Sequence, residues 1–523
     1  MPPQAKFTVL GLLVGQAYIL VAQAYRWPNP QLEYADKLLF EQNFLTGLVE
    51  NCAGRHETTV AAQWVRIAYH DMATHNIEDG TGGLDASIAF ELDRAENVGI
   101  GMPESITDFV GLTSPVAGLA DLIAIGTVMA VAGCGGPIVP YRAGRIDATA
   151  AGPLGVPEPF QDLASHTESF RRQGFSQSEM IALVACGHTL GGVRRDDFPD
   201  IIHDTSANLT TFDRTTGFDS TVVTEYLDGS TNNPLVVGPN ATTNSDLRIF
   251  LADGNVTMQN LASAENFGKT CSALLGRMIN AVPKDVVLSE VVEPIEHKVG
   301  DTRLYPGSDG SFVFTTNIRM LISNPARKVT MFWSDRRGTV CGVSGCSVQP
   351  ESRRTSFLSP LAEMRGLTSG DLYSFRAQVN MTSSIDKFWF EVDEGDGSEA
   401  VIVDNGGPGF VIEQDSVLLD MGRTTRSFDP DTAMVYNFVV AVRGDESSQV
   451  SVTTYHPGLS SDEFLPTIET IQMVPDDRYP PSAGFTFFTG KGTHRITFVD
   501  VHGIVGGQTF TQTFVETDSV PFS

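Results

Sequence analysis

The spacing of apolar residues changes near residue 285, and this change limits the fold more than any other feature of the chain. From about residue 31 to 282, apolar residues recur mostly at helical spacing, as in Leu119, Leu122 and Ile123. Past Pro283, short β-branched and aromatic runs are separated by Gly, Asp, Ser and Pro. These runs are Ser311–Phe314, Val329–Trp333, Lys387–Val392, Tyr436–Val440 and Arg495–Val499. We therefore predict a multidomain chain, mainly α-helical at first and then all-β and sandwich-like.

Length and charge narrow the class of protein further. A chain of 523 residues is long for one domain. We expect a helical domain over residues 25–285 and β-rich domains over 286–404 and 405–523, or one β region over 286–523. The formal net charge of −28 would repel nucleic acid and an anionic membrane surface. Neither is therefore an expected partner.

The first 24 residues have the layout of a secretory signal peptide. Lys6 precedes an apolar run from Phe7 to Val21, and Ala22-Gln23-Ala24 offers a small-residue cleavage site. No later segment of the sequence is long and apolar enough to predict a membrane span. Four Asn-x-Ser/Thr sequons are compatible with glycosylation on the same route: Asn208, Asn240, Asn255 and Asn380. We therefore expect a secreted, extracellular protein.

Two segments carry side chains suited to chemistry in one pocket. In Arg66-Ile-Ala-Tyr-His70-Asp71, a permanent cation and a base that works near neutral pH lie one helical turn apart on one face. An imidazole can accept a proton, and a guanidinium can stabilise a developing negative charge. The second segment is the helical stretch Glu179–Gly191, which contains His188. Because Arg and His recur at this spacing by chance, the other segments decide the interpretation.

Four more segments lie between these two, and the order of all six is informative. They are Gly82–Ser87, Glu96–Gly99, Ala120–Ala124 and Gly144–Ala148. Together the six resemble the plant, fungal and bacterial haem peroxidase superfamily, and are most similar to its secreted fungal or hybrid-type members. The resemblance runs through most of residues 40–282. It implies that the helical domain is a haem peroxidase domain with haem b as its cofactor.

On the proximal side of the haem, the resemblance gives three residues a role. His188 resembles the ligand of the haem iron, and Asp246 resembles the carboxylate that accepts a hydrogen bond from that imidazole. Phe212 falls where family members carry an aromatic residue close to the proximal haem face. It is not the Trp that forms a radical in some members.

On the distal side, the resemblance makes His70 the base that takes the proton of peroxide and Arg66 the cation that stabilises the separating charge. Asn97 resembles the amide that orients the imidazole of His70. Tyr69 replaces the Phe or Trp usual before the distal His. Its hydroxyl adds either a hydrogen bond in the pocket or an electron donor.

Two groups of oxygen-bearing residues resemble the calcium sites of secreted family members. One adjoins the helix of the distal His, and the other follows the proximal His. The distal group is Asp71, Gly83, Asp85 and Ser87, and the proximal group is Thr189, Asp213, Thr215 and Asp219. The proximal segment is one residue shorter than the usual fungal pattern, so the resemblance is closer at the distal group.

All six cysteines follow the signal, and export favours their pairing. The resemblance implies a disulfide between Cys52 and Cys134. The other pairings stay open. Cys341 and Cys346 are near enough in sequence for a tight loop, which would leave Cys186 with Cys271.

The predicted function is that of a secreted haem peroxidase, which reduces hydrogen peroxide and oxidises small phenolic or similar one-electron donors at the haem edge, near residues 150–159. Manganese-oxidising, lignin-oxidising and ascorbate-specific members carry residues that are replaced here by Thr59, Gln63, Arg194, Leu183 and Asp197. Two alternatives are a haem-binding sensor without turnover and a secreted wall-binding or adhesive protein. In the latter, the β region would contact a wall or matrix.

Overall fold

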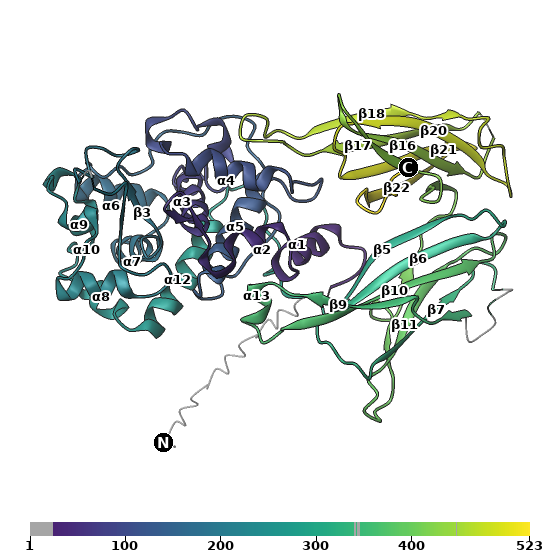
Figure 1. The fold of residues 1–523 in the computed structure, drawn as a ribbon, viewed down its shortest axis with the longest axis horizontal. Helices are drawn as coiled ribbons and strands as arrows, with labels where there is room; N and C mark the ends of the chain where they lie inside the picture. The colour runs from purple at the N-terminus through teal and green to yellow at the C-terminus, as the bar shows by residue number, and fades with distance from the viewer. Residues whose placement is uncertain (1–24, 205, 339–340, 342–345, 446) are drawn as a thin grey trace, which may run out of the picture.

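The computed structural model describes residues 25–204, 206–338, 341, 346–445 and 447–523. The predicted signal peptide, residues 1–24, lies outside these described residues. Figure 1 shows a helical body at one end of the molecule and two sheet-rich bodies at the other. The predicted order, a helical domain followed by a β region, is confirmed.

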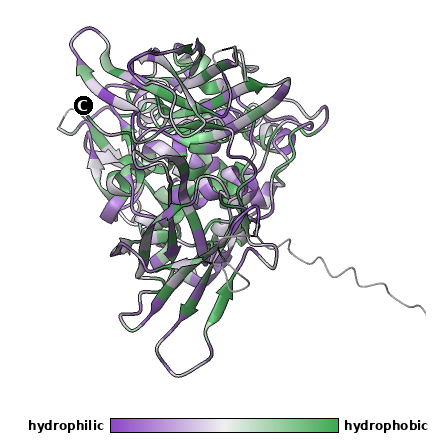
Figure 2. Ribbon diagram, turned by 90° about the vertical axis from the view of Figure 1, so that its right-hand side faces the viewer, coloured by the Kyte–Doolittle hydropathy of each residue, from purple (hydrophilic) through white to green (hydrophobic). Residues whose placement is uncertain are grey.

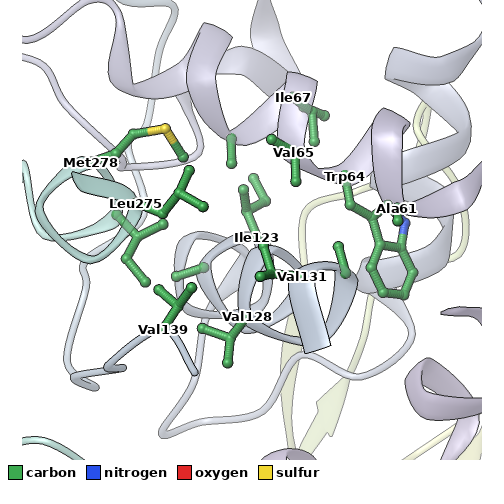
Figure 3. Packing of buried hydrophobic residues seen from close by; sticks show 14 of the residues in the cluster. Ala61, Trp64, Val65, Ile67, Ile123, Val128, Val131, Val139, Leu275 and Met278 are labelled. Atoms are coloured by element: carbon green, nitrogen blue, oxygen red, sulfur yellow. The ribbon is translucent and has the colours of Figure 1, made fainter. Parts of the chain in front are cut away.

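The helical domain is built around α5, which is buried along nearly its whole length because its sequence is apolar on every face. Figure 3 shows Ile123, Val128 and Val131 of α5 packing against the apolar face of α3 and against Leu275 and Met278 of α12. The helices are α1 (Pro30–Phe40), α2 (Phe44–Val49), α3 (Val60–Met72), α4 (Gly101–Val110), α5 (Leu119–Gly133), α6 (Leu163–Arg172), α7 (Gln177–Gly187), α8 (Thr221–Asp228), α9 (Pro234–Val237), α10 (Ser245–Phe250), α11 (Val256–Leu261) and α12 (Ala264–Ile279).

Side-chain caps fix where α3, which carries His70, and α7, which leads to His188, begin. Thr59 accepts a hydrogen bond from the backbone N–H of Ala62 and so starts α3. Ser176 and Glu179 form a reciprocal capping box at the start of α7. His188 therefore comes directly after the last turn of α7, as its C-cap.

Three disulfides join the six cysteines. Cys52 bonds to Cys134, the pair that the resemblance implies. Cys341 bonds to Cys346. The third bond, between Cys186 and Cys271, ties the last turn of α7 to α12 where both sulfurs are buried. It holds the helix that leads to His188 against its neighbour.

The first sandwich consists of two antiparallel sheets. One has the strand order β5 (His297–Pro306), β6 (Phe312–Met320), β10 (Ser369–Val379) and β9 (Ser352–Phe357). The other has the order β12 (Val401–Val403), β11 (Lys387–Asp393), β7 (Lys328–Ser334) and β8 (Cys346–Val348), and β13 (Phe410–Val411) pairs with β11. Alternate residues of β11 point inward, so Phe388 and Phe390 join the core.

The second sandwich repeats this architecture. One sheet has the order β14 (Val417–Leu419), β16 (Ala433–Val442), β20 (Thr486–Thr493) and β19 (Val474–Pro475), with β15 (Thr425–Asp429) also on β16. The other has the order β18 (Thr467–Gln472), β17 (Gln449–His456), β21 (Phe498–Val505) and β22 (Gln508–Glu516). Val439, Ala441 and Phe487 pack into the core of the first sandwich, so the two sandwiches contact each other. Hydrophobic residues recur along its strands in Figure 2.

A buried ion cluster joins the β region to the helical domain. The carboxylate of Asp36 on α1 accepts hydrogen bonds from Lys298 at 2.9 Å, from Arg319 at 2.8 Å and from the backbone N–H of Ile295 at 2.8 Å. The short helix α13 (Pro360–Glu363) contacts α1 and α5 and adds its apolar residues to the helical core. The β region is thus fixed on the α1 side of the helical domain. Among the described residues, no helix has the length and apolarity of a membrane span.

Candidate active site

A cavity of about 870 Å³ lies between α3 and α7, which is within the usual size range for a bound cofactor or ligand. Arg66, Tyr69 and His70 reach it from α3, and His188 reaches it from the end of α7. Most of the remaining lining is apolar. The structure thus brings the two segments that the sequence analysis singled out into one pocket.

On the α3 side, the ring of His70 is held by an amide. Its Nδ1 donates to Oδ1 of Asn97 at 2.9 Å, and Nδ2 of Asn97 donates to the carbonyl of Glu91 at 3.0 Å. Since Nδ1 carries the proton, Nε2 is left as a proton acceptor. Burial, together with the neighbouring charge of Arg66, lowers the pKa of His70 to about 3. The imidazole is therefore neutral and able to act as a base at ordinary pH.

The guanidinium of Arg66 is fixed near this imidazole. Nη2 donates to the carbonyl of Val98 at 2.8 Å, and the group lies 5.8 Å from the centre of the Phe198 ring. Burial lowers the pKa of Arg66 to about 10, although the carboxylate of Asp197 opposes this shift. The side chain therefore keeps its charge at neutral pH and can stabilise an anion in the cavity.

On the α7 side, His188 has a carboxylate behind it. Nδ1 donates to Oδ2 of Asp246 at 2.8 Å, and the same oxygen accepts a hydrogen bond from Nδ2 of Asn233 at 2.8 Å. Phe212 stacks on the imidazole with ring centres 4.2 Å apart. Asp246 is only 1 % exposed, so this hydrogen bond is shielded from water. Nε2 of His188 is the nitrogen left to bind a metal.

These residues fit a haem group. The cavity offers an imidazole for the iron from His188, apolar walls for the flat ring, and a second imidazole on the α3 side. Arg194 of β3 (Gly192–Arg194) also lines it, and its Nε is buried without a hydrogen-bond partner, although Asp197 lies 3.5 Å away. That unpartnered N–H suits a carboxylate such as those on the edge of haem.

The predicted distal calcium group lies at the end of α3. The carboxylate of Asp71 accepts hydrogen bonds from the backbone N–H groups of Ala86 at 2.7 Å and Ile88 at 3.0 Å, and from the hydroxyl of Ser87 at 3.4 Å. Burial, and then the charge of Asp85, raise the pKa of Asp71. Asp71, Asp85 and Ser87 therefore lie together.

Gly83 is linked to this group through a threonine. Its N–H donates to the hydroxyl of Thr74, which donates in turn to the backbone carbonyl of Asp71. The segment that contains Gly83 thus packs against the end of α3.

The predicted proximal group also comes together. The hydroxyl of Thr189 donates to the carbonyl of Asp219 at 2.6 Å, and Oδ1 of Asp213 accepts from both the N–H and the hydroxyl of Thr215. Oδ2 of Asp213 is buried without a hydrogen-bond partner, and burial raises the pKa of Asp213 to about 6. Within the described part of the chain, no three His, Cys, Asp or Glu side chains converge as a metal site. A calcium ion would therefore need hydroxyl and carbonyl ligands as well.

Tyr69 lies in the cavity wall beside His70. Its ring stacks on Phe170 with centres 5.8 Å apart, and its hydroxyl is buried beside the side chain of Gln173. Burial raises the pKa of Tyr69, so the phenol stays protonated.

Two features of the site were not identified from the sequence. Asn233 binds Asp246, yet its position just before Pro234 reads as an ordinary helix cap, which it also provides to Leu235. Glu158 lines the cavity from the loop that the sequence placed at the haem edge, and Glu96 lines it from the segment that precedes Asn97. Acidic loop residues carry no signal of their own in a chain with so many carboxylates.

Comparisons with known proteins agree with this geometry. Residues 42–259 match the family model described as "Peroxidase". A WSC domain-containing protein of Arthroderma benhamiae is 40 % identical over 341 residues, which cover 63 % of this chain and 46 % of that protein.

Two relatives with shorter matches are named as peroxidases. The putative L-ascorbate peroxidase 6 of Arabidopsis thaliana is 36 % identical over 136 residues, which are 25 % of this chain and 41 % of that protein. A mitochondrial cytochrome c peroxidase of Cryptococcus neoformans is 33 % identical over 144 residues, 26 % of this chain and 38 % of that protein. The chain thus spans less than half the length of each of these relatives. Residues 42–259 form a peroxidase domain of the plant, fungal and bacterial haem peroxidase superfamily.

Proposed function

We propose that the protein is a secreted haem peroxidase that reduces hydrogen peroxide and oxidises small phenolic or similar one-electron donors. One observation carries the proposal. The cavity has a neutral, amide-bound imidazole on one wall, His70, and a carboxylate-bound imidazole on the other, His188. The first suits proton transfer, and the second suits iron ligation.

The two sides of the cavity divide the work. Haem b, when bound through His188, supplies the iron at which peroxide is reduced. Nε2 of His70 would take a proton from one oxygen of hydrogen peroxide and return it to the other oxygen, which would leave as water. The guanidinium of Arg66 stabilises the negative charge that develops as the O–O bond breaks. Overall, one H₂O₂ and two donors AH give two radicals A• and two molecules of H₂O.

The test is made on the full chain loaded with haem b. Adding one equivalent of peroxide should change the Soret spectrum, and guaiacol should then restore the resting spectrum as it is oxidised. A spectrum that changes without guaiacol oxidation would identify a haem-binding sensor. A cavity that binds no haem, or bound haem that does not react with peroxide, contradicts the proposal.

We also propose calcium at the two groups of oxygen-bearing residues. The unpartnered carboxylate oxygen of Asp213 and the facing carboxylates of Asp71 and Asp85 support this proposal. A cation would relieve the repulsion between these acidic side chains.

Removing calcium is expected to lower the Tm of the protein by about 5–11 °C. A ligand at about 100 times its Kd contributes about 2.7 kcal/mol of stability to the folded state, and a domain of this size shifts by roughly 2–4 °C per kcal/mol. Thermal melts with excess calcium, with magnesium and with chelator measure the effect. Asp213→Asn should melt at a lower temperature and respond less to chelator. Equal melting temperatures in all three conditions would exclude calcium.

A second candidate function is attachment to a cell wall or matrix through the β region. It is favoured by the similarity to a relative that is named for a WSC domain. Co-sedimentation of the full chain with fungal wall polysaccharide tests it. Attachment would add to peroxidase activity and not replace it.

A further inference from the structure

The entrance of the cavity is built from two segments that hold each other in place. One runs from Ala95 to Val98, beside the amide that binds His70, and the other runs from Pro157 to Phe160. Arg94, which precedes the first segment, donates from Nη2 at 2.7 Å to the carbonyl of Gly152, in the loop that leads to the second segment.

Glu96 puts a carboxylate into this wall. Its side chain is 10 % exposed, and Oε1 is buried without a hydrogen-bond partner. The nearest cation is Nη1 of Arg94, at 3.8 Å, which also lies 3.0 Å from the buried Glu91. The other oxygen accepts only a long bond of 3.4 Å from the N–H of Gly155. An unpartnered buried carboxylate oxygen favours a ligand that brings a hydrogen-bond donor, above all a cationic one.

Glu158 adds a second carboxylate on the facing segment. Burial, and then the negative charge of Glu96, raise the pKa of Glu158. The two carboxylates therefore repel each other electrostatically. The backbone is held at Glu158 and at the next residue: His166 donates to the carbonyl of Glu158 at 3.0 Å, and Arg248 donates to the carbonyl of Pro159 at 2.6 Å. The ring of Phe160 is 59 % exposed at the same entrance.

The geometry points to a donor site for cationic phenols, in which Phe160 offers its ring to the phenol and Glu96 and Glu158 bind an ammonium group. This inference rests on the proposed function and names the class of donor within it. A carboxylate pair attracts a cation and repels an anion of the same shape. Each phenol still gives up one electron and one proton, and peroxide remains the oxidant.

The test compares three phenols that share one ring and differ in charge: tyramine, 4-ethylphenol and 3-(4-hydroxyphenyl)propanoate. The ratio of kcat/KM for tyramine to that for the propanoate is measured on the haem-loaded full chain. This ratio cancels any change in the reaction with peroxide. We expect a ratio well above one that falls as salt is added.

Glu96→Gln and Glu158→Gln should each lower the ratio by on the order of tenfold, the scale of one hydrogen bond to a charged group. Glu265→Gln is the matched control, because Glu265 is an exposed residue of α12 that pairs with Lys269. If Glu96→Gln does not fold, Glu158→Gln and the ratio of the unaltered chain decide. A ratio of one or less in the unaltered chain, or a ratio that Glu158→Gln leaves unchanged, overturns the inference. Failure to oxidise 4-ethylphenol would instead contradict the proposed function.

Discussion

Replacing His188 with alanine is expected to abolish tight binding of haem. The imidazole is the ring in the cavity whose Nδ1 is bound to a buried carboxylate, and this arrangement leaves Nε2 as a basic ligand. Removing it takes away the proposed iron ligand and leaves Asp246 buried, with the amide of Asn233 and the hydroxyl of Ser245 as its remaining partners. Haem titration followed by the Soret band measures the loss. We expect no saturable band at concentrations that load the unaltered chain.

Two variants make this experiment specific. Asp246→Asn keeps the ring of His188 but removes the charge behind it, so haem should bind with a shifted Soret band. His502→Ala removes a histidine of β21 in the second sandwich, outside the cavity wall, and should bind haem normally. An unchanged Soret spectrum in His188→Ala would show that another residue ligates the iron.

Replacing His70 with alanine is expected to leave haem bound and to slow the reaction with peroxide by at least about 10²–10⁴-fold, the usual contribution of positioned acid–base catalysis. The rate should fall because the variant lacks the free Nε2 of a neutral imidazole, which is the proton acceptor that α3 supplies. Stopped-flow absorbance after mixing with peroxide measures the rate constant.

Asn97→Ala serves as the graded comparison for His70→Ala. It keeps the base but frees Nδ1 from its amide partner, so the rate should fall by less. Guaiacol oxidation should fall in parallel with the reaction with peroxide in both variants. A near-normal rate in His70→Ala would exclude this residue as the base.

Much of the fold follows from local pattern. The last helix of the first domain, α12, ends at Ile279, and the first strand of the β region, β5, begins at His297. These ends bracket the change of periodicity near residue 285, because side-chain spacing alone separates helix from strand. The contact of Asp36 with Lys298 and Arg319 was not predictable. It joins residues more than 250 positions apart, and nothing in the local sequence of α1 indicates a partner.

The site was predictable where spacing or resemblance supplied the partner. Arg66 and His70 share a helix face by spacing, and the structure places both in the cavity. Asn97 and Asp246 came from resemblance, and the structure places each on the imidazole expected; their roles remain predictions. Glu96 belongs to the segment Glu96–Gly99, but its place in the cavity wall was not predictable, since only the packing of two loops leaves its Oε1 without a hydrogen-bond partner.

The β region and the cavity occupy different parts of the molecule. Every residue of the cavity wall comes from positions 58–278, whereas the β region lies at the α1 end of the helical domain, where Lys298 and Arg319 bind Asp36 (Figure 1). A wall or matrix bound by the sandwiches would therefore contact none of the residues that line the cavity. Substitutions that change what the sandwiches bind would therefore leave every residue of the cavity wall unaltered.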